Sequence, residues 1–187
     1  MKEQGLYNPL FEHENCGAGF ICSLEGKKTN DIISKALNIL TCLEHRGAVS
    51  SDGRTGDGAG ILIEIPDIFF KKECKFNLPE FKEYAVGMVF LPPKKNQLNY
   101  CVDIFEEEIK RQGLNILGWR DVPVNSKVVG AIASRSQPNI KQDFVGKIDS
   151  NQTEKDFLLK LYISRKISEN RIYQSKISQR SFFYFSS

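Results

Sequence analysis

Residues 14–26, with the sequence ENCGAGFICSLEG, place a single cysteine in front of a run of small and apolar residues. From Gly17 onward the small and apolar side chains partly alternate, which predicts a strand over residues 17–24. The Glu-Gly-Lys-Lys sequence behind this strand predicts a turn. Cys16 therefore stands directly before a predicted strand, and its role is the first question that the sequence raises.

A helix is predicted after this turn, because apolar residues return every three or four positions over residues 29–45. Thr29 or Asn30 is a suitable N-cap residue, and Gly47 follows the predicted end of the helix. The next residues, 47–58, are rich in glycine, serine and aspartate, which predicts a loop. Residues 14–58 are thus expected to form a strand, a helix and a loop in sequence.

The rest of the chain alternates between the two periodicities, which predicts an α+β fold in one layered domain. Residues 127–148 fit neither pattern. The tail ends in four aromatic residues, 182–185, an apolar run that seldom stays exposed at the end of a domain. Strands are predicted over residues 59–66, 83–92 and 114–121, and helices over residues 66–74, 97–113 and 153–170, the last with a capping box at Thr153 and Asp156.

Two interpretations of Cys16 remain open on the residues alone. It could be a packing residue that shares one face with the apolar residues at alternate positions behind it, since unpaired cysteine is often buried. It could instead be a nucleophile, which needs a base to form a thiolate near neutral pH. His13 and His45 are the only histidines. The cysteine's own α-amino group, with a pKa of about 7.7–8.0, could be that base if residues 1–15 were removed.

The loop and the helix end before it hold further candidate residues. The sequence GRTGDGAG, residues 53–60, comes before a predicted strand and lacks the lysine of a phosphate loop, so no nucleotide site is expected. Its glycines predict either a flexible turn or a bare backbone that a substrate can approach. Arg46 could cap the last helix carbonyls, or it could bind a carboxylate by two parallel hydrogen bonds.

Composition excludes several kinds of protein. The 187 residues carry 26 Lys and Arg against 23 Asp and Glu, and this net charge of +3 is too small to indicate nucleic-acid binding. No apolar run approaches the roughly 18–20 residues of a membrane span, and no signal peptide is visible, so a cytoplasmic protein is expected. Five scattered cysteines and two histidines predict no metal site.

Three motifs, found in order, carry a resemblance to a known family. They are LYNPLFEHENCGAGFICSLEG, ALNILTCLEHRGA and TGDGAGILIEIP. Together they resemble the start of the glutamate synthase large subunit and, more broadly, the class II glutamine amidotransferases of the N-terminal nucleophile superfamily. The similarity is nearly free of gaps over residues 6–70 and continues more loosely to about residue 162.

The resemblance implies a fold and a set of site residues. Residues 1–15 would be a propeptide, and residues 16–187 would be part of a glutamine amidotransferase type 2 domain. This domain is a four-layer αββα sandwich, here incomplete at its C-terminus. Cys16 would be the catalytic nucleophile, with its freed amine as the base, in the hydrolysis of glutamine to glutamate and ammonia. Arg46 would orient the cysteine or the substrate, and Gly47, Asp57 and Gly58 would shape the pocket wall.

The resemblance also implies what lies beyond this segment. In the family, ammonia passes to 2-oxoglutarate in a synthase domain that uses FMN and an iron–sulfur cluster, with electrons from NAD(P)H or ferredoxin. No cofactor is therefore expected in this segment, and the expected partners are glutamine, the remaining synthase domains and a small NAD(P)H-oxidising subunit.

The family's pattern also has parts that this chain lacks. The family's Asn-Gly oxyanion donors and its substrate-binding aspartate would lie beyond residue 187, so a fragment with weak or no activity alone is expected. The alternative is a truncated, non-catalytic binding module of the same fold.

Overall fold

The computed structural model describes residues 17–56, 58–149, 151–175 and 182–186, without the side chains of Arg46 and of residues 182–186. The chain divides into two compact units, and each is described by itself. Unit 1 comprises Met1–Ile61 and Val129–Ser134, and unit 2 comprises Leu62–Val128 and Arg135–Ser187. Both helices and strands are present, so the predicted α+β class is confirmed.

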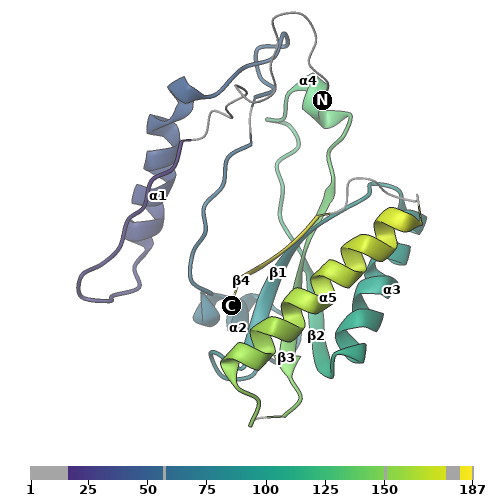
Figure 1. Ribbon diagram of the computed structural model, residues 1–187. Helices are drawn as coiled ribbons and strands as arrows, with labels where there is room; N and C mark the ends of the chain where they lie inside the picture. Colours follow the sequence, from purple (N-terminus) through teal and green to yellow (C-terminus); the bar gives the residue numbers. More distant parts are fainter. Residues whose placement is uncertain (1–16, 57, 150, 176–181, 187) are drawn as a thin grey trace, which may run out of the picture. The chain divides into compact units, whose positions relative to one another are not determined.

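Unit 2 is built on a four-stranded antiparallel sheet with the order β2-β3-β1-β4 (Figure 1). Val86 of β1 lies opposite Phe144 of β3, and the pairing of β2 with β3 shifts by a bulge between Ile116 and Gly118. The strands are β1 (Tyr84–Leu91), β2 (Leu114–Asp121), β3 (Asn139–Lys147) and β4 (Phe182–Ser186).

Two long helices cover one face of this sheet. They are α3 (Lys95–Arg111) and α5 (Glu154–Gln174), which run beside each other in Figure 1. Phe105 of α3, Phe157 of α5 and Val145 of β3 belong to one buried apolar cluster between helices and sheet. Burying side chains of this size stabilises the fold by about 1.5–3 kcal/mol each. This cluster is the main core of unit 2.

The opposite face of the sheet packs against a short helix and irregular chain. Helix α2 (Asp67–Glu73) buries Phe70 against Phe144, with ring centroids 5.0 Å apart in an edge-on arrangement. Phe76 approaches the same ring to 5.3 Å. Aromatic pairs of this geometry add about 0.5–1.5 kcal/mol beyond the buried area. The second core is therefore small and aromatic.

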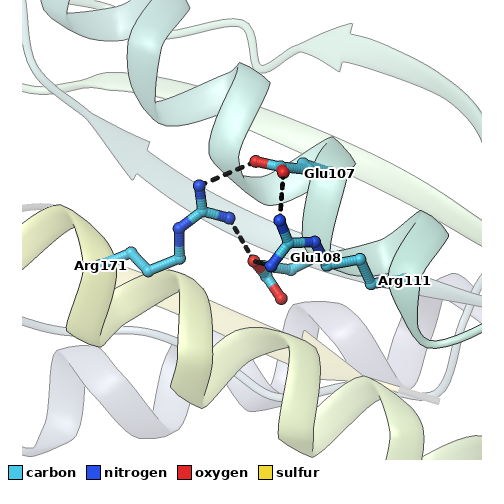
Figure 2. Close-up of polar contacts among 4 residues, drawn as sticks. All are labelled: Glu107, Glu108, Arg111 and Arg171. Carbon is cyan, nitrogen blue, oxygen red and sulfur yellow. Dashed lines mark hydrogen bonds and ion pairs between the residues drawn. The ribbon is translucent and has the colours of Figure 1, made fainter.

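A polar cluster ties α3 to α5 at the edge of the main core (Figure 2). Arg171 of α5 donates to Glu108 and, over 2.8 Å, to Glu107, both on α3. Arg111 donates to the other oxygen of Glu107 over 2.6 Å and lies 3.3 Å from Glu108. Glu108 is buried, so its charge is stable only because two guanidinium groups face it.

Unit 1 contains helix α1 (Asn30–Cys42), the single 3₁₀ turn η2 (Glu44–Arg46) and the short helix α4 (Ala131–Ser134). Helix α1 begins after Thr29, as the sequence predicts, although the Thr29 side chain makes no capping hydrogen bond. Gly26, with a φ of +67°, closes the predicted turn by donating to Ser23 O over 3.1 Å. The helix, the turn and the loop that follows are confirmed.

Two predicted strands are wrong. Residues 17–24 and 59–66 form no strand, and much of their apolar surface is exposed, as at Phe20 and Leu62. A strand needs a neighbour that accepts and donates its backbone hydrogen bonds, and neither segment has a ladder partner among the described residues. An apolar run alone does not supply that partner.

The other predicted elements agree with the structure, which adds three elements that the sequence did not predict. β1, β2, α2, α3 and α5 lie where they are predicted, and Thr153 caps α5 by accepting from Asp156 N over 3.2 Å. The Asp156 carboxylate accepts from Gln152, over 2.9 Å. The additions are α4 and β3, in the region that fitted neither pattern, and β4, over the aromatic tail. Of the helices that the described residues form, none is both long and apolar enough to cross a membrane.

Candidate functional site

The residues that follow Cys16 pack against the C-terminal half of α1 and against Leu43, the residue after it. A Cβ atom on Gly19 would lie 2.6 Å from Ile39 Cγ2, and one on Gly17 would lie 3.1 Å from Leu43 Cδ2. Only glycine allows such a close approach of backbone to the Ile39 side chain. Side chains of Ile39 and Leu43 thus fill the space next to these two glycines.

The end of α1 carries the His-Arg-Gly sequence. Leu43 N donates to Ile39 O over 3.1 Å, and the chain then makes the 3₁₀ turn that ends at Arg46. His45 Nδ1 lies 2.9 Å from Cys42 O. His45 thus approaches the last helix carbonyls, which Arg46 was one candidate to cap. Gly47 ends the turn with an extended backbone, and its N–H donates to Glu44 O over 3.0 Å.

The loop behind this turn closes on itself. Val49 and Gly56 form an antiparallel bridge, and Ser50 N donates to Thr55 O over 2.7 Å. A Cβ atom on Gly56 would lie 3.1 Å from Ala48 O, so the two ends of the loop lie in contact. Gly47 and Gly58 each lie two positions outside this bridge in the sequence.

Two of the five predicted site residues are fully described. They are Gly47 and Gly58, and a Cβ atom on Gly58 would meet no atom within 4 Å. Arg46 is described by its backbone alone, at the end of η2. Cys16 and Asp57 lie outside the described residues. The structure therefore describes the Arg46–Gly47 turn and Gly58, and the assignment of all five residues to one site stays a prediction.

Sequence reasoning missed two residues in this loop that make most of its polar contacts. The Asp52 carboxylate accepts from Thr55 N over 2.7 Å and from Ile132 N of α4 over 3.0 Å. Thr55 Oγ1 donates to Asp52 and accepts from Ala133 N over 3.2 Å. The Asp-Gly dipeptide signalled a turn, but no pattern in the sequence indicated the contact with α4.

The side chains described here do not suit an iron–sulfur cluster or another metal centre. Within the described ranges, no group of three or more His, Cys, Asp or Glu side chains could hold a metal ion. Cys22 and Cys42 are exposed, and burial raises the pKa of the half-buried Cys74 thiol, which disfavours the thiolate that ligation needs.

A sequence profile of the glutamine amidotransferases class-II matches residues 16–187. The match covers both units and begins at the cysteine of the opening motif. The chain belongs to this family.

Similar proteins point to one kind of enzyme within it. The chain is 46% identical over 170 residues to the glutamate synthase [NADPH] large chain of Bacillus subtilis. The aligned region covers 90% of this chain and 11% of the relative. It is 42% identical over 178 residues to the glutamate synthase [NADH] of Saccharomyces cerevisiae, covering 88% and 8%. It is 38% identical over 185 residues to a chloroplastic ferredoxin-dependent glutamate synthase of Arabidopsis thaliana, covering 97% and 11%.

These matches extend the resemblance seen in the motifs to nearly the whole chain. The relatives differ in the electron donor that their names give, yet all three are glutamate synthases. The chain is thus a class-II glutamine amidotransferase domain homologous to those of glutamate synthases, and an enzyme by family. It spans about a tenth of the length of these relatives.

Proposed function

We propose that this chain is the glutamine-hydrolysing part of a glutamate synthase, with Cys16 as its nucleophile. The observation that carries the proposal is the family match, which begins at Cys16. An N-terminal cysteine can use its own α-amine as a base, because that amine titrates at about 7.7–8.0. The proposal therefore includes removal of residues 1–15 as a propeptide.

The proposed reaction has two stages. The α-amine takes the thiol proton, and the sulfur attacks the carboxamide carbon of glutamine. The tetrahedral intermediate collapses as its C–N bond breaks, and the amine returns the proton to the leaving ammonia. Water then hydrolyses the glutamyl thioester to glutamate and restores the thiol. In this second stage the α-amine takes a proton from the attacking water and returns it to the sulfur as the C–S bond breaks, so the amine carries the proton in both stages.

The described geometry supports this assignment in two ways. Gly17, the residue after Cys16, packs on Leu43, just before the turn that ends at Arg46. The Val49–Gly56 bridge joins the chain that follows Gly47 to the chain that leads to Gly58. We assign to Arg46 the orientation of the cysteine or the substrate carboxylate, and to Gly47, Asp57 and Gly58 the pocket wall.

The proposal extends to the architecture and to the parent protein. A sheet with two long helices on one face, as in unit 2, would supply one α layer and one β layer of a four-layer αββα sandwich. Ammonia would pass to 2-oxoglutarate in synthase domains that carry FMN and an iron–sulfur cluster, with a small NAD(P)H-oxidising subunit as a further partner. The cytoplasmic location stays a prediction.

The test is the intact mass of the purified chain before and after incubation with an electrophilic glutamine analogue. The first covalent step needs less of the pocket than full turnover, so labelling is the more direct readout. We expect loss of the mass of residues 1–15 and a single adduct on Cys16. The control is Cys22→Ser, which removes an exposed competing thiol and should still be labelled once.

The opposite results would reject the proposal. A folded chain that keeps its full mass and takes no adduct would favour the non-catalytic module. An adduct that forms on Cys22 or Cys42 as fast as on Cys16 would reflect mere exposure of thiols and would also remove the assignment.

A further inference from the structure

The loop between Val49 and Gly56 is closed by few contacts of its own. They are the single bridge between these residues, the Ser50–Thr55 backbone hydrogen bond and a turn in which Gly53 N donates to Ser50 O over 3.0 Å. Gly53 has a φ of +68°, which only glycine adopts without strain. A two-stranded hairpin of this size is at best marginally stable by itself. Something else must hold the loop in one orientation.

The Asp52 carboxylate supplies part of that support. Its Oδ1 accepts from Arg54 N over 3.1 Å and from Thr55 N over 2.7 Å, which closes the turn locally. Its Oδ2 accepts from Thr55 Oγ1 over 2.6 Å and from Ile132 N of α4 over 3.0 Å. These hydrogen bonds, that from Ile132 above all, hold the pKa of Asp52 well below its usual range. The carboxylate is charged at every physiological pH.

Thr55 on the loop and Gly130 before α4 complete the contact between the loop and α4. Thr55 Oγ1 accepts from Ala133 N over 3.2 Å, so α4 donates to both polar side chains of the loop. A Cβ atom on Gly130 would lie 2.5 Å from Thr55 N and 2.8 Å from Asp52 Oδ2. The residue before α4 must therefore be glycine for the loop to come this close. We call Asp52, Thr55, Gly130 and the two α4 amides the loop clip.

We propose that Asp52 and Thr55 are positioning residues for glutamine hydrolysis: through the loop clip they fix the orientation of the loop whose two ends carry Gly47 and Gly58. This inference rests on the proposed function. Neither side chain is assigned contact with the substrate. Because a misplacement of about 1 Å at a catalytic site can cost about a hundredfold in rate, a loop released from α4 should bind and orient an amide substrate poorly.

Two variants separate the link with α4 from the local turn. In Asp52→Asn, the amide oxygen can still accept from Arg54 N and Thr55 N, but the amide nitrogen faces the Ile132 N–H as a second donor. In Thr55→Val, the hydroxyl contacts with Asp52 and Ala133 are both lost, whereas Thr55→Ser keeps the hydroxyl. Matched controls in α1 are Asp31→Asn and Thr41→Val, at exposed positions away from the loop.

The experiment measures labelling of Cys16 by the electrophilic glutamine analogue at several concentrations, beside alkylation of Cys16 by iodoacetamide. We expect Asp52→Asn and Thr55→Val to lower the second-order labelling constant by about tenfold or more. Thr55→Ser and both controls should stay within about twofold of the wild type. Iodoacetamide needs no glutamine pocket, so its rate should be the same in all variants. A variant that merely unfolds would change both reagents.

Hydrogen exchange shows whether the clip has opened in the same samples. The amide of Ile132 should exchange faster in Asp52→Asn, and the amide of Ala133 should exchange faster in Thr55→Val, because each amide loses its acceptor in that variant. If these amides are released and glutamine-analogue labelling is unchanged, the positioning role is overturned while the proposed function stands. If the wild-type chain takes no label on Cys16, the proposed function fails and the positioning role fails with it.

Discussion

The buried carboxylate of Glu108 on α3 binds the guanidinium of Arg171 on α5, although the two residues are 63 positions apart in the sequence. Arg111 approaches the same carboxylate to 3.3 Å from its own helix. The contact therefore combines a local partner with one that exists only when α5 has packed. This pair reports directly on the assembly of unit 2.

Replacing Arg171 with methionine should destabilise unit 2. The change leaves a buried carboxylate with Arg111 alone, and removing one partner of a buried pair costs about 3–5 kcal/mol. Because Arg111 still faces Glu108 and the Arg171 guanidinium is partly exposed, we expect a smaller loss, of about 2 kcal/mol in the free energy of unfolding. Urea titration followed by circular dichroism measures this value.

The matched comparison is Glu107→Gln, which removes the more exposed carboxylate of the same cluster. We expect a clearly smaller loss than for Arg171→Met, because the charge at position 107 is solvated in either state. Equal losses for the two variants would contradict the view that burial of Glu108 governs the energetics of the cluster.

Asp143 should make stability depend on pH. The residue is fully buried on β3, neither carboxylate oxygen has a hydrogen-bond partner among the described residues, and burial raises the pKa from 3.8 to about 7. Between these pH values the folded state keeps a proton that the unfolded state releases. Stability should therefore fall as the pH rises from about 4 to about 7 and then stay level.

The Asp143→Asn variant tests this dependence. It should gain stability relative to the wild type as the pH rises, by at most about 4 kcal/mol above pH 7. Unfolding midpoints in urea at pH 5 and pH 8 measure the difference, with Asp31→Asn as the exposed control that leaves the pH dependence unchanged. Parallel curves for Asp143→Asn and the wild type would show that the carboxyl is not buried in solution.

Gly118 should not tolerate a side chain. A Cβ atom there would lie 2.5 Å from Phe76 Cδ1 and 2.8 Å from Cγ of the same ring, which packs over the backbone at the bulge in β2. Gly118→Ala should therefore cost about 1–3 kcal/mol, measured by thermal or urea unfolding. In a Phe76→Ala background the same change should cost little. Additive losses would exclude this contact as the cause.

The described cysteines should differ in their reactivity towards iodoacetamide. Cys22 and Cys42 are exposed, Cys74 is half-buried with its thiol pKa raised by burial, and Cys101 is completely buried. Cys22 and Cys42 should react first, Cys74 more slowly, and Cys101 only as the chain unfolds. Peptide mapping over time measures the order, and early modification of Cys101 would contradict the packing of α3.

Elements with a regular apolar face were predicted correctly. Two exposed apolar runs were wrongly predicted to be strands. In α3, Phe105 and Ile109 recur at helical spacing and are buried, so pattern and packing agree. Residues 59–66 also have an apolar pattern, but Leu62 is exposed and no ladder forms. Pairing with another strand is a long-range property that the local sequence does not contain.

β3 was not predicted, because its local sequence lacks a regular apolar pattern although it has strand partners in the sheet. Lys141, Gln142 and Asp143 interrupt its apolar pattern, yet the strand lies inside the sheet with a partner on each side. Lys141 donates to Asp121 on β2 over 2.6 Å, and Gln142 accepts from Arg120 over 2.9 Å. Partners on a neighbouring strand thus stabilise Lys141 and Gln142, whereas the carboxylate of Asp143 has no such partner among the described residues.

The candidate site could be predicted in part. The His-Arg-Gly turn and the glycines of the loop follow from local sequence and from the family motifs. The loop clip could not be found in this way, because the groups that Asp52 and Thr55 bind on α4 are backbone amides, one of them 80 positions from Asp52. Every residue except proline carries such an amide, so no residue pattern marks these two as partners.

The discontinuity of unit 1 has a consequence for synthesis on the ribosome. Asp52 leaves the ribosome 80 residues before the amide of Ile132 that completes its contacts, and β1, α3 and β2 are made in between. At about 5–20 residues per second, this interval lasts roughly 4 to 16 seconds. During that time the loop can close only through its own turn, and Leu62–Val128 of unit 2 emerges before unit 1 is complete. Translation speed between codons 52 and 132 thus decides how long the nascent chain carries an unanchored loop.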